Sequence, residues 1–122
     1  MTPQELVEAL WGRFSRLEFE AVAELLHDEF VCEWMQSRER IRGRENYIAL
    51  NKHYPGQWRI EIERLAITPQ QVISQIKLTN GDQLDYAVSF FEFKGGKIVK
   101  EVDFWASPYP APDWRKQWVE YF

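Results

Sequence analysis

The chain has 122 residues, the length of one ordinary domain, and its hydrophobic fraction of 45% and aromatic fraction of 16% exclude a disordered chain. Its net charge of −4 without a basic stripe excludes nucleic-acid binding, and no apolar run approaches the ~20 residues that cross a bilayer. One cysteine and two histidines exclude an intrachain disulfide and leave too few ligands for a transition metal, so we predict no metal and no other cofactor.

The N-terminus predicts an amphipathic helix. Its first residues are polar rather than those of a signal peptide, so we expect a cytoplasmic protein with no membrane partner. Thr2 and Glu5 fit a capping box, and Pro3 stands where a first-turn proline is tolerated. Apolar side chains then recur at three- and four-residue steps, which places them on one face of a helix. They are Leu6, Val7, Leu10, Trp11, Phe14 and Leu17.

Two further helices and a strand are predicted before the middle of the chain. A short helix ends near His27, whose side chain we expect to cap that helix. Residues 30–35 predict a strand, in which Cys32 is expected to be a small buried hydrophobe. Gly43 begins the next helix, and the pair Pro55-Gly56 ends it.

The hydrophobic period changes to two after this helix, which predicts antiparallel strands. One strand covers residues 58–68, and a second, 72–78, is followed by Asn80-Gly81, the strongest short signal for a hairpin. A two-residue turn at Asn80-Gly81 sets Asp85 opposite Ile76. Odd positions of one strand then share a face with even positions of the other.

The second hairpin, at Gly95-Gly96, leaves two registers open. A two-residue turn sets Ser89 opposite Val102, whereas a three-residue loop with Gly96 left-handed sets Ser89 opposite Glu101. Because side chains alternate along a strand, the two registers send different residues of the last strand, 98–105, toward the helices.

The residues after three closely spaced prolines predict a C-terminal helix from Asp113. Trp114, Trp118 and Phe122 follow at four-residue spacing. We therefore expect the two tryptophans to pack against the domain or across a dimer.

Helices first and strands afterwards indicate a single α+β domain, residues 1–122, with helices packed on one face of an antiparallel sheet. The stretches 91–99 and 101–105 resemble the closing hairpin of SnoaL-like proteins. The middle of the chain resembles a bacterial subgroup of the same family at residues 33–37, 39–43, Asn51 and 54–56. This family is part of the nuclear transport factor 2-like superfamily. The resemblance implies a cone-shaped, cystatin-like fold with N-terminal helices on a curved antiparallel sheet and a small-molecule pocket between them.

Ketosteroid isomerases resemble this chain more distantly. In them the positions matching Ser89, Glu101, Asp103 and Trp105 line the cavity, which implies the three-residue loop at the second hairpin. The cavity residues predicted on that basis are Asp85, Ala87, Ser89, Glu101, Asp103 and Trp105, together with Trp34 and either Leu50 or Asn51.

Asp103 resembles, in its place on the strand, the acid/base aspartate expected in SnoaL-type polyketide cyclases. A carboxyl group held in an apolar cavity has a raised pKa, which suits it to proton transfer near neutral pH. Glu101 is then its catalytic partner or binds a ligand hydroxyl, and Ser89 and Asn51 orient the ligand. The alternative is that both carboxylates are half-exposed and paired with arginine or lysine.

The catalytic set of ketosteroid isomerases does not carry over. The isomerase's general base matches Trp34, its oxyanion tyrosine matches Leu10 and its oxyanion aspartate matches Ser89. The chain also lacks an Asp-Arg-Asp set placed as in limonene epoxide hydrolase. We therefore predict a small-molecule-binding domain with acid/base chemistry of isomerase, cyclase or lyase type on a small apolar ligand. The alternative is a domain that binds its ligand or a second copy without chemistry.

An interaction surface is predicted on the other face of the sheet. The side chains there form an apolar patch too large to leave in contact with water, so we expect a homodimer through the sheet. The patch consists of Tyr86, Val88, Phe90, Val102 and Phe104.

Overall fold

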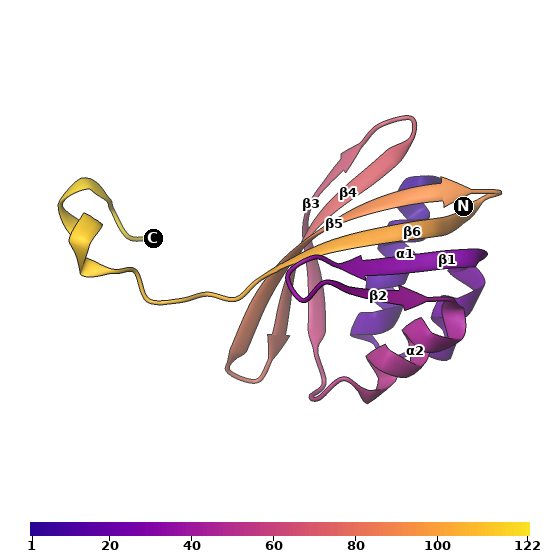
Figure 1. Cartoon of the computed structure of the whole chain (residues 1–122), viewed down its shortest axis with the longest axis horizontal. Helices are drawn as coiled ribbons and strands as arrows, with labels where there is room; N and C mark the ends of the chain where they lie inside the picture. The colour runs from indigo at the N-terminus through magenta and orange to yellow at the C-terminus, as the bar shows by residue number, and fades with distance from the viewer.

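The computed structural model describes residues 1–122 and contains the predicted α+β arrangement, with helices on one side of a curved sheet (Figure 1). The helical elements are α1 (Pro3–Ser15), the 3-10 helix η1 (Glu20–Leu25), α2 (Arg44–His53) and the 3-10 helix η2 (Asp113–Trp118). The strands are β1 (Leu26–Trp34), β2 (Glu39–Arg42), β3 (Arg59–Ile67), β4 (Gln71–Asn80), β5 (Gln83–Lys94) and β6 (Lys97–Ala106).

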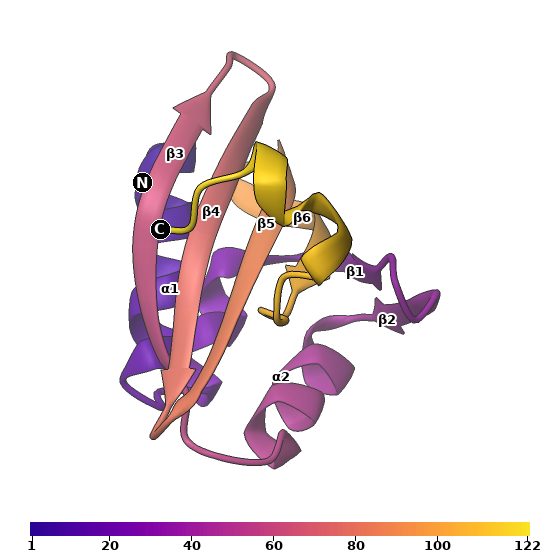
Figure 2. The same cartoon turned by 90° about the vertical axis from the view of Figure 1, so that its left-hand side faces the viewer.

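The six strands form one sheet in the order β2-β1-β6-β5-β4-β3. All neighbouring pairs are antiparallel except β1 and β6, which run parallel. The sheet is therefore mixed, whereas the sequence predicted a purely antiparallel one. Helix α1 packs on β3 and β4, and α2 packs on β1. Figure 2 shows both helices on the same side of the sheet, which leaves the other side of the central strands uncovered. No helix is long and apolar enough to span a membrane.

Helix α1 begins and packs as its sequence predicts. The Thr2 hydroxyl accepts a hydrogen bond from the backbone N–H of Glu5, and the Glu5 carboxylate accepts one from the backbone N–H of Thr2. This capping box satisfies two of the N–H groups that a helix start leaves free. Five of the six predicted apolar residues are buried. Leu17, the sixth, lies beyond the helix with φ of 61° and is 41% exposed.

The segment after η1 differs from the prediction. Leu26 already has an extended backbone, so His27 lies in β1 and does not cap a helix. Its Nδ1 atom accepts a hydrogen bond of 3.0 Å from the backbone N–H of Glu29. Strand β2 was not predicted because three of its four residues are charged, which hides the alternation that marks a strand. Only Ile41, opposite Cys32 of β1, is buried there.

The first hairpin turns at Gly81-Asp82, one residue later than predicted. Asp85 is therefore opposite Leu78 rather than Ile76, and Ala87 is opposite Ile76. The predicted register was wrong by two residues. Because side chains repeat every two residues, each one still faces the predicted side of the sheet.

The second hairpin combines features of both predicted alternatives. Its turn has two residues, Gly95 and Gly96, between the paired Lys94 and Lys97. A β-bulge then shifts the register by one residue, so that Ser89 is opposite Asp103 rather than Glu101 or Val102. A three-residue turn would also have shifted the register by one residue. The bulge therefore directs the side chains of β6 to the same faces of the sheet as the predicted three-residue loop. Odd-numbered residues of β5 and β6 therefore share the face toward the helices.

The core lies between this concave face of the sheet and the helices. Trp11 of α1 packs edge-on against Phe91 of β5, with ring centroids 5.9 Å apart. The Trp11 indole N–H also donates a 3.0 Å hydrogen bond to Ser74 of β4, so the buried ring has no unpaired polar atom. This contact helps to hold α1 in place above β4 and β5.

The C-terminal segment leaves the sheet after β6 and projects away from it, as Figure 1 shows in yellow. Asp113–Trp118 form a 3-10 helix rather than the predicted α-helix, and none of its residues is buried. Trp114 and Trp118 are 71% and 72% exposed. The prediction that they pack against the domain is therefore wrong, and packing across a dimer stays a prediction.

Candidate functional site

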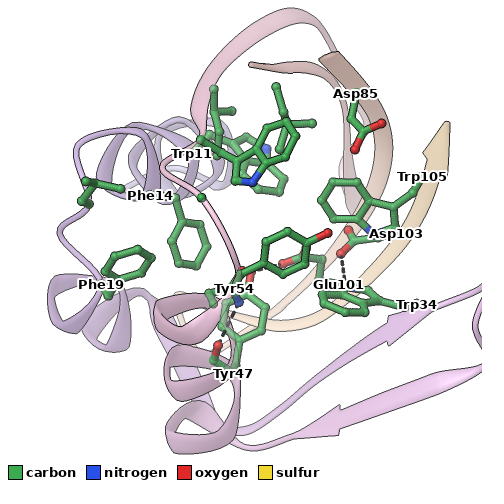
Figure 3. A pocket seen from close by; sticks show the side chains of 16 residues that line it. Trp11, Phe14, Phe19, Trp34, Tyr47, Tyr54, Asp85, Glu101, Asp103 and Trp105 are labelled. Carbon is green, nitrogen blue, oxygen red and sulfur yellow. Dashed lines mark hydrogen bonds between the residues drawn. The ribbon is translucent and has the colours of Figure 1, made fainter. Parts of the chain in front are cut away.

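A cavity opens between the helices and the concave face of β5 and β6 (Figure 3). Its empty space is about 710 Å³ with the open mouth counted, of which about 70 Å³ is roomy enough to hold the centre of a water molecule. Eleven of its sixteen lining residues are hydrophobic. The lining consists of Trp11, Phe14, Leu17, Phe19, Trp34, Tyr47, Asn51, Tyr54, Gly56, Trp58, Ile60, Leu78, Asp85, Glu101, Asp103 and Trp105.

Asp103 lies in the wall of this cavity with its carboxylate surrounded by hydrogen-bond donors. The Ser89 hydroxyl donates to Oδ1 at 2.5 Å, and the Trp34 indole N–H donates to Oδ2 at 3.0 Å. The Cys32 thiol also points to Oδ2, at 3.4 Å. Burial raises the pKa of Asp103 above its ordinary value, although these donors oppose the rise by stabilising the carboxylate.

Glu101 lies two residues earlier on the same face and is 1% exposed. The Tyr47 hydroxyl of α2 donates a 2.6 Å hydrogen bond to its Oε1, and Glu101 also forms a hydrogen bond with Asp103. Burial, and next the neighbouring Asp103 carboxylate, raise the pKa of Glu101 well above its ordinary value. Two carboxyl groups side by side in an apolar site cannot both ionise easily, so the pair loses its two protons in separate steps, and the higher of the two pKa values lies well above the ordinary range.

The acid pair also shifts the pKa values of its polar neighbours. Burial, and next the Glu101 carboxyl, raise the pKa of both the Cys32 thiol and the Tyr47 hydroxyl. Cys32 is therefore a hydrogen-bond donor in this site, and not only the small hydrophobe predicted from the sequence. Ligand atoms of Cys32, Glu101 and Asp103 lie within 4.8 Å of one another. A metal ion held there would require the thiol and Glu101 to lose their protons, which this environment opposes.

The structure brings most of the predicted site residues together. Trp34, Asn51, Asp85, Glu101, Asp103 and Trp105 line the cavity. Ser89 lies behind Asp103 and contacts it rather than the cavity, and Ala87 does not line it either. Leu50 packs against the core instead, so Asn51 is the α2 residue of this pair that faces the cavity. No salt bridge includes either acid, so the prediction of half-exposed carboxylates paired with arginine or lysine is wrong.

Besides apolar lining residues and Gly56, sequence reasoning missed the two tyrosines of the site, Tyr47 and Tyr54. Tyr47 was assigned only to the predicted helix. It is 2% exposed, and its ring lies 4.8 Å from that of Phe30, so most of its surface serves the core. Only its hydroxyl reaches the acid pair. A tyrosine among apolar residues of an amphipathic helix was the available signal, since a buried hydroxyl requires a partner.

Three aromatic rings, those of Trp34, Tyr54 and Trp105, lie beside the acid pair (Figure 3). The Trp34 and Trp105 rings have centroids 6.1 Å apart and an interplanar angle of 82°. The Trp34 and Tyr54 rings have centroids 6.4 Å apart and an angle of 86°. The indole Nε1 of Trp105 is buried and makes no hydrogen bond within the protein. The wall next to the carboxyl groups is thus a corner of three aromatic rings with one free N–H donor.

Comparisons with known proteins identify relatives along most of the chain. The family model of the SnoaL-like domain matches residues 7–101. An NTF-2 like protein of unknown function from Burkholderia xenovorans is 33% identical over 98% of this chain and 94% of that one, with a TM-score of 0.83. A candidate ketosteroid isomerase from Kribbella flavida is 30% identical over 97% and 87% of the two chains, with a TM-score of 0.88.

A more distant solved structure shares the fold. An LEH-like epoxide hydrolase from M. tuberculosis is 23% identical over 83% of this chain and 80% of that one, with a TM-score of 0.71. A search of curated protein sequences finds no match.

Proposed function

The chain belongs to the SnoaL-like domain family, and from this premise we propose that it is an acid/base enzyme of isomerase, cyclase or lyase type that acts on a small ligand in the cavity. The observation that carries the proposal is the pair of carboxyl groups, Asp103 and Glu101, buried side by side in an apolar wall with no cation to neutralise them. Carboxyl groups with shifted pKa values in a cavity commonly act as the acids and bases of proton transfer.

The two acids have different roles in this proposal. Asp103 is the ionised partner, because four donors surround it, and it accepts the proton that the ligand loses. Glu101 carries the proton of the resting pair and supports Asp103 through their shared hydrogen bond. Because the pair is shielded from water, Asp103 can return the proton to another atom of the same ligand, which amounts to an isomerisation or to one step of a cyclisation or elimination.

The site does not favour ketosteroid isomerisation or limonene epoxide hydrolysis. The positions matching the ketosteroid isomerase catalytic residues hold Trp34, Leu10 and Ser89, and Leu10 is fully buried in the core. No arginine lines the cavity, so the Asp-Arg-Asp set of limonene epoxide hydrolase is missing as well. We therefore propose acid/base chemistry, but on a substrate other than a ketosteroid or limonene epoxide.

The proposal is tested by hydrogen exchange on simple carbon acids. The protein is incubated in heavy water with a panel of small ketones, neutral and amine-bearing, and loss of the α-hydrogen signals is followed by NMR. We expect catalysed exchange with at least one ketone, and Asp103→Asn to lower its rate by at least about 100-fold. Asp82→Asn, in the exposed turn between β4 and β5, is the matched control and should leave the rate unchanged. Exchange that survives in Asp103→Asn, or no exchange at all, favours a binding function without chemistry.

We also propose that two copies associate through the convex face of the sheet. The predicted residues lie there together, with Val88 and Phe104 37% and 42% exposed and the rings of Phe90 and Phe104 6.0 Å apart. Light scattering at micromolar concentration should give twice the chain mass of 14.6 kDa, and Phe104→Asp should return the protein to that mass. A wild-type protein of 14.6 kDa under these conditions would contradict the dimer.

A further inference from the structure

The charges in the cavity are unbalanced. Three of its lining residues carry carboxyl groups, Asp85, Glu101 and Asp103, and none is lysine, arginine or histidine. None of the three takes part in a salt bridge. A buried charge in a protein is normally paired, because desolvation is otherwise costly. An anionic ligand would add to this imbalance, whereas a cationic ligand would supply the missing counter-charge.

The walls around these carboxyl groups suit a cation. Trp34, Tyr54 and Trp105 form the corner of nearly perpendicular rings described above. In Figure 3 the Asp85 side chain points toward the same part of the cavity from β5, the strand next to β6. The face of an aromatic ring carries negative potential, so such a corner attracts a cation, most strongly where water is excluded.

The acid pair has little capacity left for a ligand that donates many hydrogen bonds. Asp103 already accepts hydrogen bonds from Ser89, Trp34 and Cys32. A carboxylate has about four acceptor positions, so these partners occupy most of them. A primary ammonium or a guanidinium group would leave donors unpaired here. A cation with few or no N–H groups would not.

We propose that the cavity selects a small organic cation, a tertiary or quaternary ammonium group carried by the substrate, and holds it against Trp34, Tyr54 and Trp105 beside the acid pair. The methyl groups of such a cation pack on the rings, while its charge balances the carboxylates. This inference deepens the proposed function and rests on it in one respect, that the cavity is the ligand site.

Cation binding is expected to be coupled to proton release. The titratable groups in the lining and around the pair are Tyr47 of α2, Tyr54 directly after α2, Cys32 of β1 and Asp85 of β5, and none of them is cationic. A cation next to the pair lowers the affinity of the pair for protons, so cation binding releases part of the bound proton to the buffer. Affinity for a cation should therefore rise with pH, and affinity for a neutral ligand should not.

Calorimetric titration of the wild-type chain with two probes tests the inference. One probe is choline, and the other is the neutral alcohol in which a tert-butyl group replaces the trimethylammonium group, so size and shape are matched. We expect choline to bind at least about tenfold more tightly, with an affinity that increases with pH. Equal or tighter binding of the neutral probe, or no saturable binding of choline, would overturn the inference.

Two variants locate the effect. Trp105→Leu should weaken choline binding at least about tenfold and leave the neutral probe within about threefold, because it removes a π face but keeps an apolar wall. Trp118→Leu, in the exposed 3-10 helix η2, is the matched control and should change neither. If choline fails while Asp103→Asn still abolishes ketone exchange, the cation is wrong and the proposed chemistry stands. If choline binds selectively but no ketone exchanges, the cation site stands and the proposed chemistry is wrong.

Discussion

The concave and convex faces of β5 and β6 are built from alternate residues of the same two strands, yet they carry opposite chemistry. On the concave face Ser89, Glu101 and Asp103 are at most 2% exposed. On the convex face Val88 and Phe104 are apolar, and more than a third of each is exposed. Proteins ordinarily bury apolar side chains and expose charged ones, so these residues on each face reverse the common arrangement.

The difference teaches that two separate demands act on one hairpin. Replacing buried ionised groups with apolar side chains of similar size is often neutral or stabilising, so packing alone does not explain two acids in the wall of a core. Exposed aromatic and aliphatic side chains on adjacent strands are explained by a partner surface. The concave face is therefore interpreted as the side that meets a ligand, and the convex face as the side that meets protein.

The largest expected effect is a difference between the two faces in how much a substitution lowers the free energy of unfolding. Phe91→Ala on the concave face leaves a hole beside Trp11 and should lower the free energy of unfolding by about 3–5 kcal/mol. Phe104→Ala on the convex face should change the free energy by no more than about 1 kcal/mol at concentrations where the chain is monomeric. Urea unfolding followed by circular dichroism measures both. Similar losses for the two variants would break the comparison.

A smaller effect concerns how the acid pair couples stability to pH. Burial and the Asp103 carboxylate hold the pKa of Glu101 above 4.5, so the folded protein keeps a proton that the unfolded chain releases. The contribution of Glu101 to stability is therefore complete below pH 4.5 and is lost as pH rises through its raised pKa. Glu101→Gln has no such proton and should remove this decline.

The measurement is urea unfolding of both proteins between about pH 5 and pH 8. The advantage of Glu101→Gln over the wild type should grow with pH across this window. A constant difference would mean that Glu101 titrates alike in the folded and unfolded chains. The carboxyl pair would then lack the shifted proton on which the proposed chemistry depends.

The smallest effect is expected in the C-terminal segment. Deleting residues 113–122 removes side chains that make no buried contact with the domain, so the melting temperature of the monomer should change by less than about 2 °C. Calorimetric scans at low and high protein concentration provide the measurement. A loss that appears only at high concentration would show that Trp114 and Trp118 pack across the dimer.

Regular elements could be predicted from the sequence because their signals are local. The capping box at Thr2 and the glycine at position 43 mark the starts of α1 and α2, and alternating residues mark β3 to β6. Strand β2 could not be predicted, since its pairing with β1 stabilises four mostly charged residues that have no strand pattern of their own. The parallel neighbours β1 and β6 lie about 70 residues apart in the chain, and no local pattern links them.

The candidate site was partly within reach of the sequence. Alternation along β6 placed Glu101, Asp103 and Trp105 on one face, and the family resemblance chose which face it was. The hydrogen bond from Tyr47 to Glu101 depends on where α2 lies above the sheet, which is a matter of tertiary packing. The thiol of Cys32 and the indole of Trp34 reach Asp103 from the neighbouring strand for the same reason.

The β-bulge in β6 has a consequence for how this hairpin tolerates insertions and deletions. Phe93 is opposite Ile98 and Glu92 is opposite Lys100, so Val99 is the surplus residue. Losing Val99 would leave every later pair in place and both acids inside the cavity. Losing Val102, only three positions further, would turn Asp103 to the outside while Glu101 stayed within. Among descendants of this sequence, a deletion at Val99 should be found in active proteins, and a deletion at Val102 should not.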